Sequence, residues 1–234
     1  METIFIYLYL FTNLFSLFKK LFYNEFRILF KHKVNKEKLT NYIWESVIYL
    51  FSFLSELFLL FKYDWGFKPA LYSQKQLPTF LISLKYLLCS SFYLNEIIDL
   101  VFYKEFKDQN LIMIIHHSFT LCLLAFSYEV NLTRFGIAIM ALHNISDPFL
   151  NLAKLFYRLK MNVLNSISGF IFAITFIVPR LYIFPFIVIK QAFKSTINNK
   201  VIRCVILSSL IILQILHVIW TSMIVKIAFR MIIG

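Results

Sequence analysis

Glycine and proline are scarce in this chain of 234 residues, which has only 4 glycines and 5 prolines. Long linkers are rich in such residues, so neither an extended linker nor a second soluble domain is expected. Cysteine is also rare: Cys89, Cys122 and Cys204 stand apart in apolar segments and form no C-x-x-C pair. The cysteine pattern therefore indicates neither a disulfide framework nor a zinc site, and we expect no bound metal.

Acidic side chains are few as well, because 12 Asp and Glu residues face 24 Lys and Arg residues and leave a net charge of +12. The basic residues are spread over many short loops, which is typical of a membrane protein with positively charged cytosolic loops. The one dense run, residues 27–38, is expected to lie near anionic lipid. We therefore predict a lipid bilayer as the surroundings of the chain and no nucleic acid as its partner.

Apolar residues are abundant, since 60% of the chain is hydrophobic and the mean hydropathy is +0.73. Soluble domains are roughly 45–50% apolar, so this excess points to a membrane protein that crosses the bilayer several times. The 28 phenylalanines and 13 tyrosines suit lipid-facing and interfacial positions. The composition predicts an all-α membrane protein.

The apolar residues fall into segments that predict about seven transmembrane helices. All but the fourth easily meet the ~20 residues that a span requires. The first lacks a basic leader and an A-x-A-like cleavage site, so we expect a span there and not a signal peptide. The segments are 4–23, 42–61, 79–103, 111–128, 133–157, 164–192 and 201–230.

The loop after the first segment sets the predicted orientation. Lys19, Lys20 and the basic run 27–38 follow this segment directly. Positive charge of this density favours the cytosolic side of the membrane. The N-terminus is then expected in the lumen and, after seven spans, the C-terminus in the cytosol.

Ionisable side chains inside two neighbouring segments form the candidate site. His116 and His117 lie in the fourth segment and point about 100° apart on a helix. His143 and Asp147 lie in the fifth segment and share one helical face. Such groups are costly in a membrane and usually functional, although a buried polar network that only joins helices is the alternative. Arg134 in the same region favours the functional interpretation.

The residue types narrow the chemistry. Five histidines are too few for a di-iron membrane oxygenase, and an H-x-x-H-H box would need histidine where Met113 stands. Imidazole with carboxylate suits acyl transfer, in which histidine acts as nucleophile or general base. A reaction inside the bilayer implies a lipid substrate.

The residues in and after this region resemble the signature of ceramide synthases in the TLC-domain (longevity-assurance) family. The resemblance extends over about 60–234, in order and with sensible spacing. It is carried by His116-His117, Thr120, Ser127-Tyr128, Asn131, Arg134-Phe-Gly136, His143-Asn144-Ile-Ser146-Asp147, Leu150-Asn151-Leu-Ala153-Lys154, Arg180 to Pro185, and Leu213-Gln214-Ile-Leu-His217-Val-Ile-Trp220.

The resemblance implies a fold, a location and an activity. The fold would be a TLC-type six-helix barrel over residues 41–234, preceded by one transmembrane helix and a basic cytosolic loop over 1–40. The activity would be transfer of a fatty acyl group to the amine of a sphingoid base in the endoplasmic reticulum membrane. Acyl-CoA would be a co-substrate, with no cofactor besides, and the chain could assemble as a homo- or heterodimer.

The resemblance also implies site residues. His116 or His117 would be the nucleophile or base, with His116 preferred as carrier of an acyl-imidazole, and His143 and Asp147 would orient and polarise. The substrate-binding candidates are Asn144, Arg180, Arg134, His217 and Trp220. Packing alone would equally explain His217 and Trp220, and an interfacial position would explain Arg134.

Two positions depart from the family signature, since Asn144 replaces an aspartate and Asn151 replaces a glutamate. Asparagine holds a hydrogen bond but accepts no proton at neutral pH. Asn144 therefore leaves open a non-catalytic TLC-domain protein that binds lipid or assists membrane-protein biogenesis. A third alternative is an acyltransferase with another amine or an alcohol as acceptor.

Overall fold

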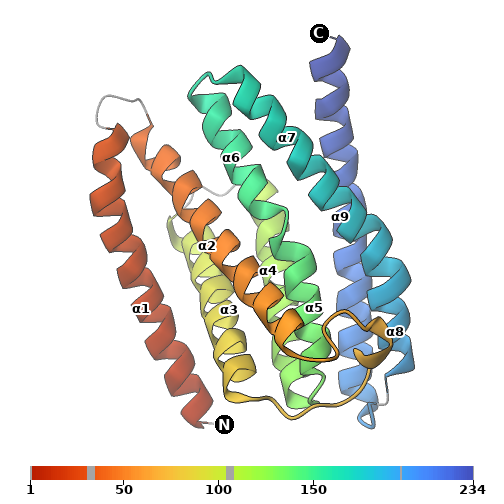
Figure 1. Ribbon diagram of the computed structural model, residues 1–234. Helices are drawn as coiled ribbons and strands as arrows, with labels where there is room; N and C mark the ends of the chain where they lie inside the picture. The colour runs from red at the N-terminus through yellow and green to blue at the C-terminus, as the bar shows by residue number, and fades with distance from the viewer. Residues whose placement is uncertain (1, 31–34, 104–107, 196, 234) are drawn as a thin grey trace.

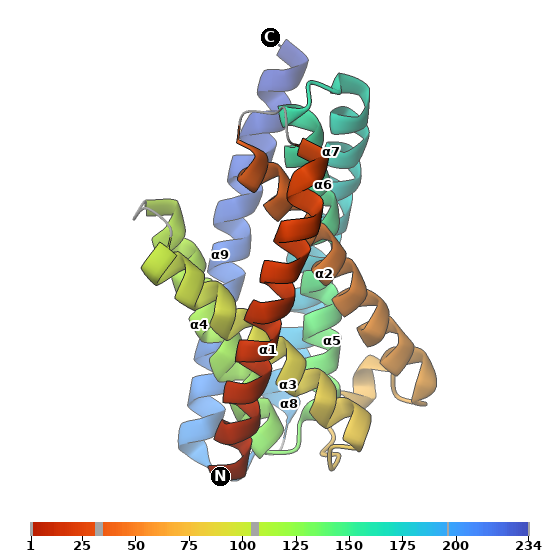
Figure 2. The ribbon, with the colours of Figure 1, turned by 90° about the vertical axis from the view of Figure 1, so that its left-hand side faces the viewer.

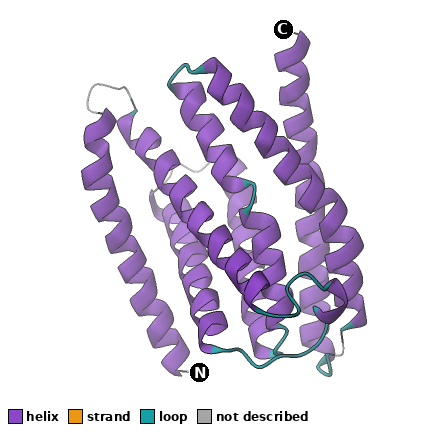
Figure 3. Cartoon of the chain, in the orientation of Figure 1, coloured by secondary structure: helices purple, strands orange, loops and turns teal. Residues whose placement is uncertain are grey.

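The computed structural model describes residues 2–30, 35–103, 108–195 and 197–233. Within these ranges the regular structure is helical, apart from one isolated bridge between Gln76 and Leu132 (Figure 3). The elements in chain order are α1 (Glu2–Phe26), η1 (Arg27–Phe30), α2 (Lys36–Lys62), η2 (Pro69–Leu71), α3 (Phe80–Ile98), η3 (Asp99–Tyr103), α4 (Asp108–Glu129), α5 (Thr133–Asn144), α6 (Asp147–Arg158), α7 (Asn162–Ile177), η4 (Val178–Ile189), α8 (Lys190–Lys194) and α9 (Lys200–Ile233).

Several of these helices are long and apolar enough to cross a membrane, which confirms the all-α membrane protein. The five runs of this kind within the described residues are 36–62, 80–102, 111–129, 162–194 and 200–229. A total of seven spans stays a prediction, because α1 and the pair α5–α6 are not among them. The N-terminus and the C-terminus nevertheless lie at opposite ends of the molecule (Figure 1).

The helices form a closed ring with one helix outside it. Around the ring, α2 packs on α3, α3 on α4, α4 on α9, α9 on η4 and α7, α7 on α6, and α6 on α2. Helix α5 continues toward α6 and contacts α2, α4 and η4. Helix α1 lies outside and packs on α3 and α2 (Figure 2). The arrangement agrees with a six-helix barrel and one additional N-terminal helix.

The fifth apolar segment is not one helix, contrary to the single span expected over 133–157. Helix α5 ends at Asn144 and α6 begins at Asp147, with a turn at 145–146. Pro148 explains the break, because it has no N–H for the Asn144 carbonyl and its ring collides with that carbonyl in a continuous helix. The break places the polar residues His143, Asn144, Ser146 and Asp147 at or beside the turn between the two helices.

The span opposite this break is also irregular. Its last part, η4, is a π-helical segment that contains Pro179, Arg180 and Pro185. Proline removes an intrahelical hydrogen bond, and wide π-type turns of this kind are frequent at functional sites. The segment packs against α5 and α9, so Arg180 faces the interior.

Candidate functional site

Three histidines from three helices meet inside the barrel. His116 of α4, His143 of α5 and His217 of α9 are all buried. The ring centroids of His116 and His143 are 6.0 Å apart, and those of His143 and His217 are 4.9 Å apart. The Nε2 atoms of His143 and His217 approach to 3.0 Å. The structure therefore joins the predicted His116 and His143 to His217, which the sequence placed in a separate segment.

The hydrogen bonds determine which ring nitrogens carry protons. His143 Nδ1 lies 2.8 Å from the Ile139 carbonyl oxygen, which can only accept, so Nδ1 is the donor. When neutral, His143 then has a bare Nε2 that accepts the N–H of His217 Nε2. Neutral His217 in turn has a bare Nδ1. Among the described residues, neither this Nδ1 nor the Nδ1 of His116 has a hydrogen-bond partner.

His117 takes a different direction from His116, as neighbouring residues on a helix must. Its ring packs on the ring of Tyr93 from α3, with centroids 5.3 Å apart, while the two histidine rings are 5.4 Å apart. His116 is thus the member of the pair that reaches the His143–His217 couple.

Aromatic side chains enclose the three histidines. Trp220 of α9 stands edge-on to His116 at 5.0 Å between centroids. Phe184 of η4, which has no exposed surface, packs edge-on against His143 at 5.5 Å and His217 at 5.0 Å. Such a surrounding excludes water and strengthens the hydrogen bonds inside it. The predicted residue Trp220 therefore lies at the site, as a wall of it.

Arg180 fastens the backbone at the α5–α6 break. One of its Nη atoms donates to the His143 carbonyl at 2.8 Å, to Ser146 Oγ at 2.9 Å and to Asp147 Oδ1 at 2.9 Å. The guanidinium also lies 4.2 Å from the centre of the Phe176 ring. The charge of Arg180 is therefore neutralised inside the protein, as a buried arginine requires.

Asp147 does not orient a histidine as expected. Its carboxylate forms an ion pair with Arg180 and accepts from Ser146 Oγ at 3.0 Å. Within the described residues no hydrogen bond joins it to an imidazole. Arg180 contacts both the His143 carbonyl and the Asp147 carboxylate across the turn.

Asn144 faces the opposite wall and belongs to a second polar cluster. Its Nδ2 donates to Glu56 Oε1 at 2.6 Å and to Ser52 Oγ at 3.1 Å, both on α2. Tyr93 donates its hydroxyl to Asn144 Oδ1 at 3.4 Å. Glu56 forms an ion pair with Lys85 of α3 at 2.9 Å. Asn144 is thus held by a buried ion pair that the sequence analysis did not single out.

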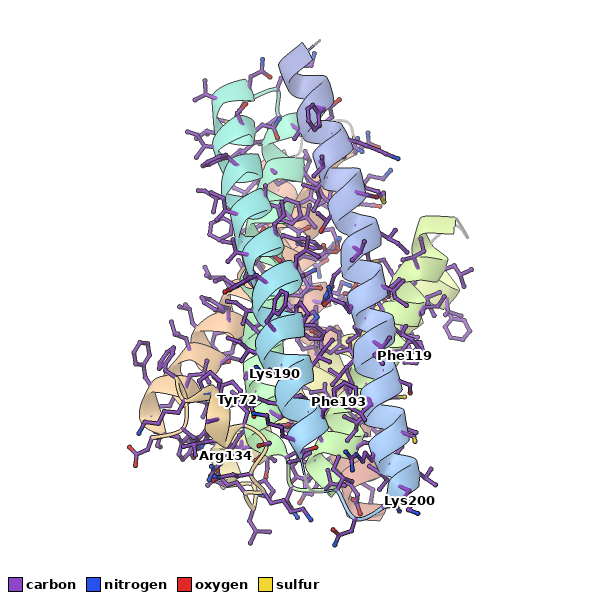
Figure 4. All side chains as sticks on the ribbon, turned by 90° about the vertical axis from the view of Figure 1, so that its right-hand side faces the viewer. Tyr72, Phe119, Arg134, Lys190, Phe193 and Lys200 are labelled. Atoms are coloured by element: carbon purple, nitrogen blue, oxygen red, sulfur yellow. The ribbon has the colours of Figure 1, made fainter. Side chains whose placement is uncertain are left out.

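Arg134 is not at the histidines. It lies at the first turn of α5, near Tyr72 and the loop between α2 and α3 (Figure 4). It donates to Gln76 Oε1 at 2.7 Å, to Gln74 Oε1 at 3.2 Å and to the Leu71 carbonyl at 3.4 Å. Nine residues of helix separate it from His143, or about 13 Å. Its position indicates that it anchors the loop.

A mainly apolar pocket extends from His143 toward that same end of the molecule. Its walls come from α3, α4, α5 and α9. Its lining includes His143, Tyr93, Thr120, Ile139, Leu213 and Ile206. Helix α5 contributes to it from Phe135 to His143, a length of about 12 Å at 1.5 Å per residue. Apolar walls with a few polar groups are typical of small-molecule pockets.

A family model described as the TLC domain matches residues 38–226 of this chain. The chain belongs to the TLC-domain family. Among curated proteins it is similar to ceramide synthase 4 of Bos taurus, with 32% identity over 77% of this chain and 47% of that protein. It is also similar to ceramide synthase 5 of Homo sapiens, with 32% identity over 87% of this chain and 55% of that protein. Ceramide synthase LOH1 of Arabidopsis thaliana is 28% identical over 84% of this chain and 69% of its own length.

These relatives assign the chain to the ceramide synthase (longevity-assurance) group of the TLC-domain family. The chain spans about half the length of the curated ceramide synthases 4 and 5 that it matches. Three signature histidines of this TLC-domain chain, His116, His143 and His217, form the buried cluster. Its Gly136 lines the pocket, and its Arg134 binds the loop between α2 and α3.

Sequence reasoning missed several side chains of this TLC-domain site. Glu56 and Lys85 are charges inside apolar segments, a signal that was present in the sequence. Phe184 and Tyr93 gave no such signal, because aromatic residues are abundant in every span. No group of three His, Cys, Asp or Glu side chains in the described ranges is arranged to hold a metal ion.

Proposed function

We propose that the protein is a sphingoid-base N-acyltransferase that uses fatty acyl-CoA and forms ceramide inside the membrane. The observation that carries the proposal is the buried cluster of His116, His143 and His217, of which His143 lines an apolar pocket. The names of the relatives supply the substrate class. A buried cluster of imidazoles suits a reaction in which a nitrogen receives and returns an acyl group.

The first half-reaction uses His116. Its unprotonated ring nitrogen attacks the thioester carbonyl, a C–N bond forms, and the C–S bond to CoA breaks. The proton lost by the imidazole passes to the leaving thiolate, so the products are acyl-imidazole and free CoA. The alkyl chain occupies the pocket between His143 and Phe135. In this position its acyl group lies beside the His143–His217 couple.

The second half-reaction returns the imidazole. The amine of the sphingoid base attacks the acyl carbon, the amide C–N bond forms, and the bond to the histidine breaks. The proton released by the amine returns to the ring nitrogen of His116. The N–H of His217 donates to His143, and this hydrogen bond holds both rings in place beside His116 while the protons are transferred.

The proposal places the chain in the endoplasmic reticulum membrane with the end that bears α1's last turn and the basic loop in the cytosol. The C-terminal end of α9 and the α6–α7 turn lie at that same end (Figure 1). Arg158 and Lys160 in this turn add to its positive charge. Acyl-CoA, which is water-soluble at its CoA end, would enter from this side.

Asn144 is the observation that favours a second function, a non-catalytic TLC-domain protein that binds lipid or assists biogenesis. A lost carboxylate beside the histidines would be consistent with lost activity. The burial of all three histidines in one cluster favours the enzyme, since a scaffold has no need of bare ring nitrogens there.

The test is acyl transfer from one labelled acyl-CoA to a panel of sphinganine, other long-chain amines and long-chain alcohols, in membranes that contain this chain. Product from sphinganine alone supports the proposal. Product from another acceptor alone would show that this acceptor, and not a sphingoid base, is the substrate. Binding of lipid without product from any acceptor would support the non-catalytic function. A histidine adduct of acyl mass, found by peptide mass spectrometry after acyl-CoA loading, tests the covalent step.

A further inference from the structure

Two opposite charges are buried together where α2 meets α3. Glu56 has no exposed side-chain surface and Lys85 has 6%, with Nζ and Oε1 2.9 Å apart. Lys85 also donates to the Ser52 carbonyl at 3.1 Å, to Ser52 Oγ at 2.7 Å and to Ser55 Oγ at 2.9 Å. A buried ion pair with this many hydrogen bonds is strongly disrupted when one partner is removed.

Asn144 connects this pair to the histidines. It follows His143 in the last turn of α5, and its amide nitrogen is 2.6 Å from Glu56 Oε1. A carboxylate accepts and does not donate, so the amide nitrogen must face Glu56 and the amide oxygen must face Tyr93. The Tyr93 ring in turn packs on His117. One side chain therefore bridges Glu56 and the residues beside the acyl site.

The same two residues are held from the other wall. Arg180 binds the His143 carbonyl on the η4 side, while Glu56 binds the Asn144 side chain on the α2 side. The end of α5, which Pro148 leaves without a helical continuation, is thus fastened between two ion pairs. The two fastenings hold the backbone from which the His143 ring projects, while the ring itself bonds to the Ile139 carbonyl and His217.

The charge balance explains the asparagine. An aspartate at position 144 would bring a second carboxylate against Glu56 Oε1, with Lys85 as the cation that this cluster contains. Two carboxylates that share one cation cannot both stay ionised in a buried place. An amide at position 144 is compatible with Glu56, because its N–H donates a hydrogen bond to the carboxylate.

On this geometry, and resting on the function proposed above, we infer that Glu56 is the carboxylate of this site. It stands in α2 in place of the aspartate that the family signature carries at position 144. Glu56 is a positioning residue: together with Lys85 it holds Asn144, and through Asn144 it holds His143 and Tyr93. Asn144 is then no sign of lost activity, since Glu56 supplies a buried carboxylate beside it.

Restoring the signature aspartate at position 144 should therefore reduce activity and not raise it. Asn144→Asp lowers kcat by about tenfold or more, because it opposes two buried carboxylates. Glu56→Gln alone also lowers kcat, because Lys85 is left without its anion. The double variant Glu56→Gln/Asn144→Asp again has one carboxylate for one lysine, and its kcat returns to within about threefold of the wild type. The KM for acyl-CoA stays constant, since none of these groups lines the pocket.

Asn151→Asp, made alone and with Glu56→Gln, is the matched control. Asn151 is equally buried, at 2% exposure, and lies on α6, so it takes the same change of atoms near the site. Its effect should add to that of Glu56→Gln with no recovery. The wild type, the three cluster variants and the controls are compared as full-length protein in membranes, with kcat and KM measured for sphinganine acylation.

The melting temperature of the detergent-solubilised protein separates this inference from the proposed activity. If the wild type makes no ceramide, the proposed function fails, and the inference is judged by whether the double variant recovers the stability lost in Asn144→Asp. Additive losses in the double variant, or an Asn144→Asp enzyme as active and as stable as the wild type, would overturn the inference. A double variant that does not fold would overturn it as well.

Discussion

The Nε2 atoms of His143 and His217 lie 3.0 Å apart, although 74 residues separate them in the chain. One of the two must donate, and the bond from His143 Nδ1 to the Ile139 carbonyl makes His217 the donor. His217 therefore fixes the ring of His143, and His143 stacks beside His116. The last helix of the chain thus orders the histidines of the fourth and fifth segments.

His217→Ala should lower kcat by roughly 10²-fold, because the ring of His143 loses the N–H donor at its Nε2 and is less firmly held. The melting temperature should fall only slightly, so that the loss of kcat is not explained by unfolding. Thr221→Val on the same helix is the control, since the Thr221 hydroxyl bonds only to the His217 carbonyl of its own helix. An enzyme with full kcat after His217→Ala would show that the couple has no part in the reaction.

Arg180 and Asp147 should differ in what their loss costs. Arg180→Met leaves the His143 carbonyl, Ser146 and Asp147 without their shared donor, and should destabilise by about 3 kcal/mol. Asp147→Asn should cost about 1 kcal/mol, because Arg180 keeps two other acceptors. Thermal unfolding in detergent measures both. Equal losses would mean that Arg180 serves mainly as the counter-ion of Asp147.

Two helical glycines, Gly136 on α5 and Gly169 on α7, offer a paired test of packing. A Cβ at Gly136 would collide with the Tyr86 hydroxyl, whereas one at Gly169 meets nothing within 4 Å. Gly136→Ala should destabilise by about 1–3 kcal/mol, and Gly169→Ala should stabilise by about 0.5–1 kcal/mol. Tyr86→Phe should recover part of the first loss. No recovery would mean that the backbone, and not the hydroxyl, sets the limit.

The apolar pocket should set the preferred acyl length if it holds the acyl chain. Ile206 lines it about 16 Å along α9 from His217. Ile206→Phe should lower transfer of the longest acyl groups by about tenfold and leave short ones unchanged, as a shortened pocket requires. Ile219→Phe, on the exposed face of the same helix, should leave the profile intact. Product profiles from a mixture of acyl-CoAs decide, and an unchanged profile with Ile206→Phe would place the chain elsewhere.

The membrane architecture was predictable because a span needs a continuous apolar run, which the sequence displays directly. The histidines stood out for a related reason, since His116 and His143 interrupt such runs. The break at 145–146 could have been predicted from Pro148, whose missing N–H ends a helix wherever it lies. The prediction of a single span over 133–157 did not take Pro148 into account.

The partners of the charged residues were not predictable in the same way. The sequence shows Glu56, Lys85, Asn144 and Arg180 on four different elements, and any of several pairings would satisfy their charges. Only the arrangement of the helices decides that Arg180 meets Asp147 while Glu56 meets Lys85. Arg134 illustrates the same limit, because its place in the signature gives no indication that it binds the loop at the other end of α5.

The most direct test of the account compares ceramide formed from labelled acyl-CoA and sphinganine by the wild type and by His116→Ala, at equal amounts of folded protein in membranes. We expect product from the wild type with Asn144 in place, and a loss of at least about 10²-fold in His116→Ala. Wild-type protein that is folded yet forms no ceramide with any acyl length, or a His116→Ala variant that retains the wild-type rate, would contradict the account.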